Sequence, residues 1–358
     1  MHFNNDLNIN IVNNTFSNNI SDSNGGVICI DSIDNTLNLD LNLTSNTFEK
    51  NEGVNGGAIY INDNNNSLEK RNDRSYIMII NDNIFKENKA ENYGGALYSR
   101  INTTISSISH SKNNIFKHNK SGILGGAIYS QNSREYNILD LQYNNENVFK
   151  DNTANDIIND YTSKPAYISL NTTINTWGNR ITSGNFLPML FILYDEYDNI
   201  MNITNYYNNI ILKVNLEKKF KSKHILGNEK NYYLTGNIAS FASGKCNFNN
   251  LRIYANPDTY LLRLSIEGYK DKIELKFSDI EIEIKECNNN EIKRIDTLKN
   301  ITYCETPICM DSCPIQQSAI CIPPSNNTIE NDPTKNICKC LDGWKETNCN
   351  TKIMVDIR

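Results

Sequence analysis

The feature that most constrains the fold of this chain is a motif that occurs four times in its first 130 residues. Each copy contains Phe-x-x-Asn, followed eight or nine residues after the Phe by a Gly-Gly pair. The copies are Phe16, Asn19, Gly25 and Gly26; Phe48, Asn51, Gly56 and Gly57; Phe85, Asn88, Gly94 and Gly95; and Phe116, Asn119, Gly125 and Gly126. Phe149 and Asn152 form a fifth copy without the glycines. The copies recur every 31 to 37 residues, which indicates units that bury their apolar faces only by stacking on one another.

Each unit contains three short runs that favour β-strands. The first run alternates apolar and polar residues, as at 7–11 and 37–43, the second surrounds the Phe, and the third follows the glycines, as at 58–61. A period of two is typical of strands, and no run sustains the 3.6-residue period of a helix. Three strands per unit, stacked unit on unit, predict a parallel β-helix with a triangular cross-section.

The residue types of the motif suit the interior and corners of such a coil. We expect each Phe to point inward and stack on the Phe of the next coil. We expect the Asn to occupy a corner, to adopt a left-handed backbone and to pair through its amide with the Asn of the next coil. The glycines allow a sharp turn, and we expect Gly95 to need a positive φ.

At these motifs the chain resembles the repeats of the chlamydial polymorphic outer membrane proteins, which also occur in large surface proteins of protists and anaerobic fungi. The resemblance covers residues 3–171, close to half of the chain. It implies a right-handed parallel β-helix that is displayed outside the cell and used for adhesion rather than catalysis.

The composition changes near Trp177, where the glycine pairs stop and Tyr and Lys become more frequent. Expected strands lie at 187–194, 210–216, 232–234, 251–254, 260–266 and 273–284. This number of short strands predicts an antiparallel sandwich. Residues 190–199 and 257–262 resemble segments of immunoglobulin-like and filamin-like repeats. We therefore divide the chain into β-helix repeats at 1–175, an immunoglobulin-like sandwich at 176–286 and a cysteine-rich module at 287–358.

The last module is dense in cysteine, because seven of the ten cysteines lie between Cys304 and Cys349. The pattern Cys338-x-Cys340, Gly343-Trp344 and Cys349 resembles the closing half of an epidermal growth factor-like module. The resemblance implies disulfides that join Cys309 to Cys321, Cys313 to Cys338, and Cys340 to Cys349. It assigns no partner to Cys29, Cys246, Cys287 or Cys304. A zinc site is the competing interpretation, although no His lies nearby.

Composition narrows the set of partners. The net charge of −6 comes from charges of both signs and forms no basic stripe, so we expect no nucleic-acid partner. The longest apolar runs are too short to span a bilayer, whereas clustered cysteines indicate an oxidising compartment. No signal peptide precedes the repeats. We therefore expect a piece of a longer secreted or membrane-anchored protein that continues before Met1 and beyond Arg358, and membrane contact only through those further segments.

Parallel β-helices also include pectin-degrading enzymes, so the carboxylates and histidines of the repeats are candidate catalytic residues. Hydrolysis requires two carboxylates across the sugar, but Asp40 and Asp140 fall in distant coils and are expected to point outward. His118 lies between the Phe and the Asn of its repeat and is expected to be a surface residue. Ca²⁺ ligation is conceivable at the acidic cluster after the first sandwich strand, but an exposed turn explains that cluster better. The cluster comprises Asp195, Glu196 and Asp198.

Two classes of function follow from these patterns. The favoured class is a non-catalytic extracellular surface protein, an adhesion, ligand-binding or structural ectodomain that needs no cofactor and binds a surface protein or polysaccharide. The alternative is a carbohydrate-active β-helix, a lyase or hydrolase whose site the sequence does not reveal. A conserved cluster of Asp, Lys or Arg on one β-helix face would favour the alternative, whereas a long flat surface of Asn, Ser and Thr without such a cluster would favour the first class.

Overall fold

The computed structural model describes residues 7–31, 39–62, 76–100, 108–131, 146–172, 179–202, 207–219, 232–324 and 330–353. In these residues, all regular secondary structure consists of β-strands. The chain forms two compact units, which are described separately. Unit 1 comprises Met1–Tyr167 and Leu193–Ile203, and unit 2 comprises Ile168–Ile192 and Thr204–Arg358.

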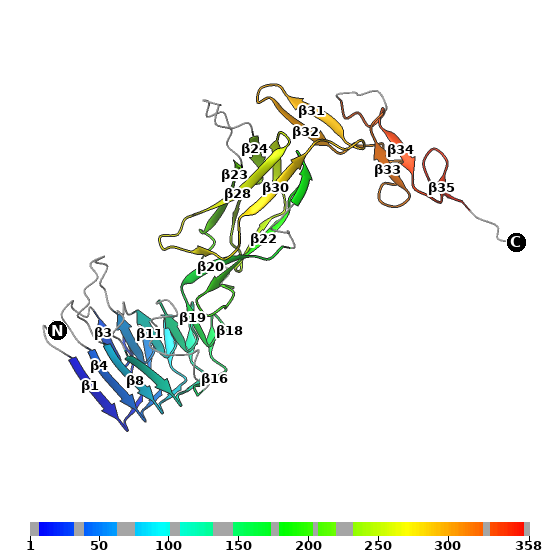
Figure 1. Ribbon diagram of the computed structural model, residues 1–358. Coiled ribbons are helices and arrows are strands. Elements are labelled where there is room, and N and C mark those ends of the chain that lie inside the picture. The colour runs from blue at the N-terminus through cyan, green and yellow to red at the C-terminus, as the bar shows by residue number, and fades with distance from the viewer. Residues whose placement is uncertain are drawn as a thin grey trace, which may run out of the picture. The chain divides into compact units, whose positions relative to one another are not determined.

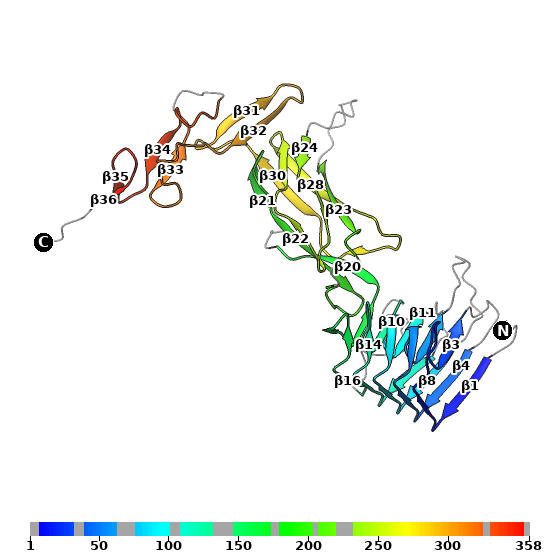
Figure 2. The same cartoon turned by 180° about the vertical axis from the view of Figure 1, so that it is seen from behind.

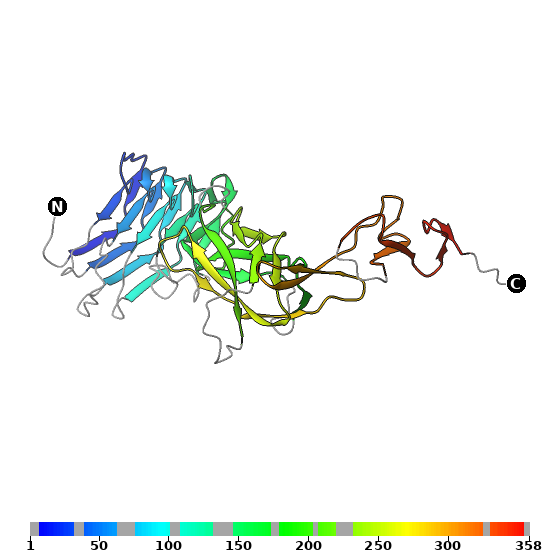
Figure 3. The ribbon, with the colours of Figure 1, turned by 90° about the horizontal axis from the view of Figure 1, so that it is seen from above.

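Unit 1 is a β-solenoid in which corresponding strands of successive coils stack into four sheets (Figures 1 and 3). Sheet A contains β1 (Leu7–Val12), β4 (Leu39–Thr44), β8 (Tyr76–Asn81) and β12 (Ile108–Lys112). Sheet B contains β2 (Thr15–Ser17), β5 (Thr47–Glu49), β9 (Ile84–Lys86), β13 (Ile115–Lys117) and β16 (Val148–Lys150). Sheet C contains β6 (Glu52–Asn55), β10 (Lys89–Tyr93), β14 (Lys120–Ser121), β17 (Thr153–Ala154) and β18 (Ile157–Ile158). Sheet D contains β3 (Ile28–Asp31), β7 (Ile59–Asn62), β11 (Leu97–Arg100), β15 (Ile128–Ser130) and β19 (Tyr161–Ser163).

The repeats correctly predict a parallel β-solenoid, but they do not predict the number of strands in each coil. A fourth strand, in sheet C, lies between the motif Asn and the glycine pair. The prediction of three strands is therefore wrong, and the triangular cross-section inferred from it loses its basis. The sequence of β6, Glu-Gly-Val-Asn, shows no apolar alternation, because this strand is fixed by backbone pairing with β10 rather than by a broad apolar face.

Register between coils is residue for residue, so identical side chains form columns. Phe16 pairs with Phe48, and Phe48 with Phe85. Neighbouring rings in this column stack 4.7 to 5.2 Å apart, and Phe48, Phe85 and Phe116 are fully buried. Apolar residues of sheets A and D surround the column and complete one continuous core. Stacked aromatic rings thus supply much of the burial along the solenoid axis.

The two glycines of each pair have different roles. The first adopts the left-handed backbone, as Gly94 does with φ 65°, and Gly95 does not, so the expectation of a positive φ at Gly95 is wrong. Gly95 is instead required by close packing, since a Cβ there would lie 2.0 Å from the carbonyl oxygen of Gly126 in the next coil. The first glycine makes the turn, and the second lets adjacent coils approach.

Unit 2 contains two larger sheets (Figure 2). One has the order β26 (Lys245–Phe248), β22 (Met189–Asp195), β20 (Pro165–Leu170) and β29 (Glu274–Leu275). The other has the order β21 (Asn179–Thr182), β30 (Ile280–Lys285), β28 (Asp258–Glu267), β23 (Ile211–Lys218) and β25 (Ile238–Ser240). Strand β21 pairs with β30 in parallel, whereas β28 pairs with both of its neighbours in antiparallel fashion. The expected single strand at 273–284 is wrong, because the chain leaves one sheet after β29 and enters the other at β30.

The remaining strands of unit 2 form four two-stranded ribbons. They are β24 (Tyr232–Thr235) with β27 (Arg252–Ala255), β31 (Ile292–Asp296) with β32 (Ile301–Glu305), β33 (Ala319–Ile322) with β34 (Ile337–Cys340), and β35 (Trp344–Lys345) with β36 (Thr351–Lys352). The β33–β34 and β35–β36 ribbons contain few buried apolar side chains, and the bonded cysteines around Ala319 form the core of this region.

Candidate functional site

Two columns of Asn side chains run along the solenoid. One contains the motif residues Asn19, Asn51, Asn88, Asn119 and Asn152. The other contains Asn14, Asn46, Asn83, Asn114 and Asn147, each two residues before the motif Phe. Sequence reasoning missed the second column, although Asn-x-Phe occurs in all five copies.

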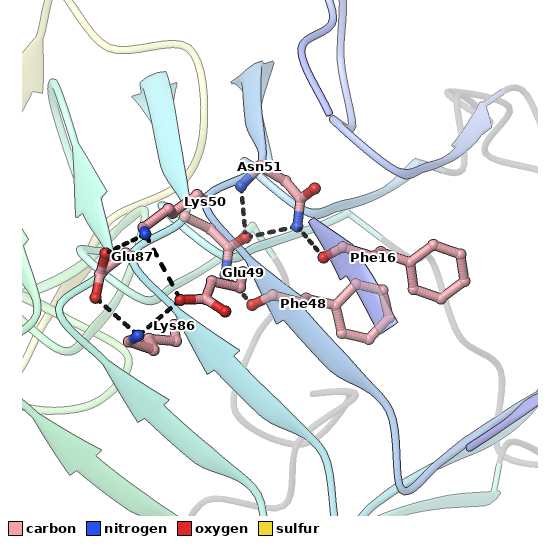
Figure 4. A network of polar contacts seen from close by, with 8 residues as sticks. Phe16, Phe48, Glu49, Lys50, Asn51, Lys86 and Glu87 are labelled. Atoms are coloured by element: carbon pink, nitrogen blue, oxygen red, sulfur yellow. Dashed lines mark hydrogen bonds and ion pairs between the residues drawn. The ribbon is translucent and has the colours of Figure 1, made fainter. Parts of the chain in front are cut away.

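The interior members of each column share one set of hydrogen bonds, whereas the side-chain amide of Asn14, at the end of its column, donates to the carbonyl of Val12. The side-chain amide of Asn88 donates to the carbonyl oxygen of Phe48 at 2.9 Å and to Oδ1 of Asn119 at 3.0 Å. Its own Oδ1 accepts from the backbone N–H and the side-chain amide of Asn51. Figure 4 shows the corresponding bonds of Asn51 one coil earlier. These buried amides are fully occupied, so they are structural groups and not ligand contacts.

The left-handed corner residue is not the motif Asn, as expected from the sequence, but the residue before it. Lys50, Glu87 and His118 have φ values of 54°, 56° and 55°. Their side chains leave the solenoid, which explains why this position varies while the next one is always Asn. The motif Asn instead keeps the position in which its side-chain amide pairs with the Asn side chains of the neighbouring coils.

Charged side chains form a network across the outer face of two coils (Figure 4). Lys86 donates to Glu49 at 2.6 Å and lies 3.1 Å from Glu87, and Lys50 bridges the same two carboxylates at 3.8 and 3.7 Å. The hydrogen bond from Lys86 lowers the pKa of Glu49. All four side chains are partly exposed, so this network offers paired surface charges and no desolvated acid or base.

Two of the acidic and histidine candidates, Asp40 and His118, lie in different coils of the solenoid. Asp40 is half-buried in β4, and Asp140 lies outside the described residues. His118 is half exposed at its corner, with Nδ1 3.9 Å from Asp151.

Glu196 and Asp198 lie in a turn, and Asp198 is exposed as expected, but the expectation is wrong for Asp195. It is fully buried and belongs to the segment Leu193–Ile203, which returns to unit 1. Its carboxylate accepts hydrogen bonds from the backbone N–H groups of Ser163, Tyr197 and Asn199 and from the side-chain amide of Asn199, at 2.8 to 3.1 Å. Burial raises the pKa of Asp195, and the hydrogen bonds oppose that rise. With its lone pairs occupied in this way, the carboxylate holds the returning segment against the last coil and is a poor cation ligand.

The described residues contain no cluster of three or more His, Cys, Asp or Glu side chains that could hold a metal ion. Asp195 therefore does not form a Ca²⁺ site with Glu196 and Asp198.

Tyrosines form a further column on the outer side of sheet D. The rings of Tyr60 and Tyr98 stack at 4.8 Å, and those of Tyr98 and Tyr129 at 5.6 Å. Burial raises the pKa of Tyr98 to about 12. All three residues are at most 7% exposed, so the column packs within unit 1 and offers no open aromatic platform.

Eight cysteines form four disulfides, all in unit 2. The structure brings together the three pairs that the growth factor-like resemblance implies, Cys309–Cys321, Cys313–Cys338 and Cys340–Cys349. It adds Cys287–Cys304, which joins the end of the larger sheet region to β32. The bonded cysteines of the tail, with Ala319, form the small core of that region. These sulfurs are thus occupied by disulfides rather than by zinc.

Two cysteines are free thiols. Cys29 is exposed in β3, and Cys246 is buried in β26. Burial raises the pKa of Cys246 to about 12, which keeps it protonated and unreactive near neutral pH. In the described part of the chain, no helix is both long and apolar enough to cross a membrane.

Comparison with known proteins agrees with the solenoid. The family model of the Chlamydia polymorphic membrane protein repeat matches residues 15–31 and 84–100. Both matches run from the motif Phe through the glycine pair into the following strand of sheet D. No curated protein and no solved structure matches the chain. The chain therefore carries polymorphic membrane protein-like repeats built as a β-solenoid, which together with the disulfides are typical of a surface or outer-membrane protein.

Proposed function

We propose that this protein is a non-catalytic surface protein that acts outside the cell in adhesion, in ligand binding or as a structural ectodomain. The observation that carries the proposal is a polymorphic membrane protein-like solenoid in the same chain as four disulfides in unit 2. Disulfides persist in oxidising compartments, and the repeat family is named for membrane proteins.

The finer architecture is part of this proposal. We propose that the solenoid winds to the right, that the two larger sheets of unit 2 form an immunoglobulin-like sandwich, and that the tail is an epidermal growth factor-like module. Support comes from the antiparallel pairing around β28 and from the bonded pairs of the tail. The domain limits at 175 and 286 remain predictions.

The absence of catalysis is tested by incubating the purified, oxidised protein with pectin, alginate and xylan. We expect no release of reducing ends and no unsaturated sugars, because the charged groups described on the solenoid are paired and exposed. A product that disappears in Asp40→Asn, but not in the surface control Asp151→Asn, would instead establish the carbohydrate-active alternative. The location outside the cell is tested by labelling intact cells.

A further inference from the structure

A surface in unit 2 combines aromatic and cationic side chains. Residues 183–187 run between β27 and β32, since the N–H of Gly184 donates to the carbonyl of Ile253 at 2.7 Å and that of Cys304 donates to the carbonyl of Ser183 at 2.7 Å. Strand β24 borders β27 on one side, and β31 borders β32 on the other. Side chains from five adjacent extended segments can therefore share one face.

Three tyrosines lie side by side on this face. The rings of Tyr233 and Tyr254 stack at 4.3 Å across β24 and β27. Tyr303 of β32 meets Tyr254 edge to face at 5.4 Å. Gly184 lies beside this pair with φ 92°, and a Cβ there would lie 2.8 Å from the carbonyl oxygen of Cys304. Phe186 extends the face and is 49% exposed. We call Phe186, Tyr233, Tyr254, Tyr303, Arg252 and Lys299 the aromatic strip.

The two cations of the strip lie over rings rather than beside carboxylates. The Arg252 guanidinium is centred 3.8 Å from the Phe186 ring, and Lys299 Nζ lies 3.8 Å from the Tyr233 ring. Among the described residues, no ion pair joins either cation to an acidic side chain. The carboxylates of β31 and β32 have other partners, because Glu305 pairs with Arg294 and Asp296 accepts the N–H groups of Leu298 and Lys299.

We propose that the aromatic strip binds a polysaccharide containing uronic acids. Ring edges and the exposed Phe186 face suit the C–H surfaces of sugars, while Arg252 and Lys299 present donors to the carboxylates of successive units. Two cations without carboxylate partners stand out on a chain whose net charge is −6, which favours a ligand that brings its own negative charge. This inference names a ligand class for the binding protein proposed above and rests on that proposal.

The test uses the full, oxidised chain and short oligogalacturonates of defined length in titration calorimetry. Dextran supplies sugar without charge, and polyglutamate and dextran sulfate supply charge without uronate. We expect binding to oligogalacturonate that weakens with added salt, and little binding to the other three polymers. Equal binding to all polyanions would mean non-specific attraction and would overturn the proposal, as would no binding to oligogalacturonate.

Variants locate the site. The double variant R252Q/K299Q should weaken binding about tenfold or more, because it removes both charge-assisted contacts. Phe186→Ala should weaken it about threefold. Lys293→Gln is the matched control, because Lys293 precedes Arg294 on β31 and points to the face opposite to that of Arg294. The affinity of this variant for oligogalacturonate should stay within about twofold of wild type.

Thermal melts of each variant separate loss of binding from loss of fold. If R252Q/K299Q melts like the wild type and binds oligogalacturonate with unchanged affinity, the ligand binds elsewhere and the proposed site is refuted. Failure of binding together with labelling of the protein on intact cells would refute this inference and leave the proposed function standing.

Discussion

At the scale of single residues, the solenoid depends on side chains that repeat the same contacts in every coil. Each column Asn satisfies backbone groups at a corner where the strands end and no ladder partner remains. Because an amide is both donor and acceptor, one residue type can continue the column indefinitely, which neither Asp nor Leu can do. This explains why the motif keeps Asn while the corner residue before it varies.

Asn88→Ala tests the column. The change leaves the carbonyl of Phe48 and the amide groups of Asn51 without partners in a fully buried place, so unfolding should become easier by about 3 kcal/mol. Urea melts of purified protein measure the loss. Asn10→Ala is the control, because Asn10 is exposed and only accepts one bond from Asn42. Equal effects of the two changes would contradict the structural role of the column.

Gly95→Ala tests the close approach of coils. The added methyl group would overlap the Gly126 carbonyl, and backbone cannot move aside as a side chain can, so we expect a loss of about 3 kcal/mol or more. Glu91→Ala, at an exposed position of β10, should change stability by less than about 0.5 kcal/mol. A normal melt for Gly95→Ala would show that adjacent coils lie farther apart than described.

The sequence predicted the Phe column and the sharp glycine turn, because both depend on local residue types at fixed offsets. It did not predict which residue of each corner adopts the left-handed backbone, since Asn tolerates that conformation and was the natural candidate. Nor could it predict the burial of Asp195, which arises when a segment distant in sequence folds onto Ser163 and the last coil.

At the scale of elements, backbone pairing between coils decides what side-chain patterns leave open. The strands of sheet C are two to five residues long and mostly polar, so no periodicity reveals them. The break between β29 and β30 is likewise a change of sheet within an apolar sequence. Alternation is typical of the longer strands β4 and β23, where one face is buried along nearly the whole length.

The segment Leu193–Ile203 makes an element-scale prediction. Asp195→Asn replaces one oxygen with an amide that faces N–H donors, so the segment should detach more readily and stability should fall by about 2 kcal/mol. Hydrogen exchange at Ser163 and Tyr197 should speed up before the rest of unit 1. Glu196→Gln is the control. The Glu196 side chain is not part of this network, so the change should leave exchange unchanged. Unaltered exchange in Asp195→Asn would show that the carboxylate does not hold the segment.

At the scale of the whole molecule, the two units depend on different sources of stability. The described part of unit 1 relies on stacked columns and contains no disulfide, whereas all four disulfides lie in unit 2. Small ribbons with little apolar core typically lose about 2 to 5 kcal/mol when a native disulfide is removed.

Reduction should therefore affect the units unequally. With dithiothreitol, the tail after Cys304 should become sensitive to trypsin, while the solenoid fragment stays resistant. Limited proteolysis followed by mass spectrometry measures both regions in one sample. C29S/C246S, which removes only the free thiols, should digest like wild type before reduction. Solenoid cleavage at the same rate as tail cleavage would contradict independent stabilisation.

The central claim, a disulfide-bonded solenoid protein outside the cell, is tested most directly on intact cells that express the protein naturally. The cells are treated with a membrane-impermeant amine label, and the protein is then isolated under conditions that block free thiols. We predict labelled surface lysines such as Lys50 and Lys120, four disulfides, and thiols only at Cys29 and Cys246. An unlabelled protein whose tail cysteines are reduced would contradict the account.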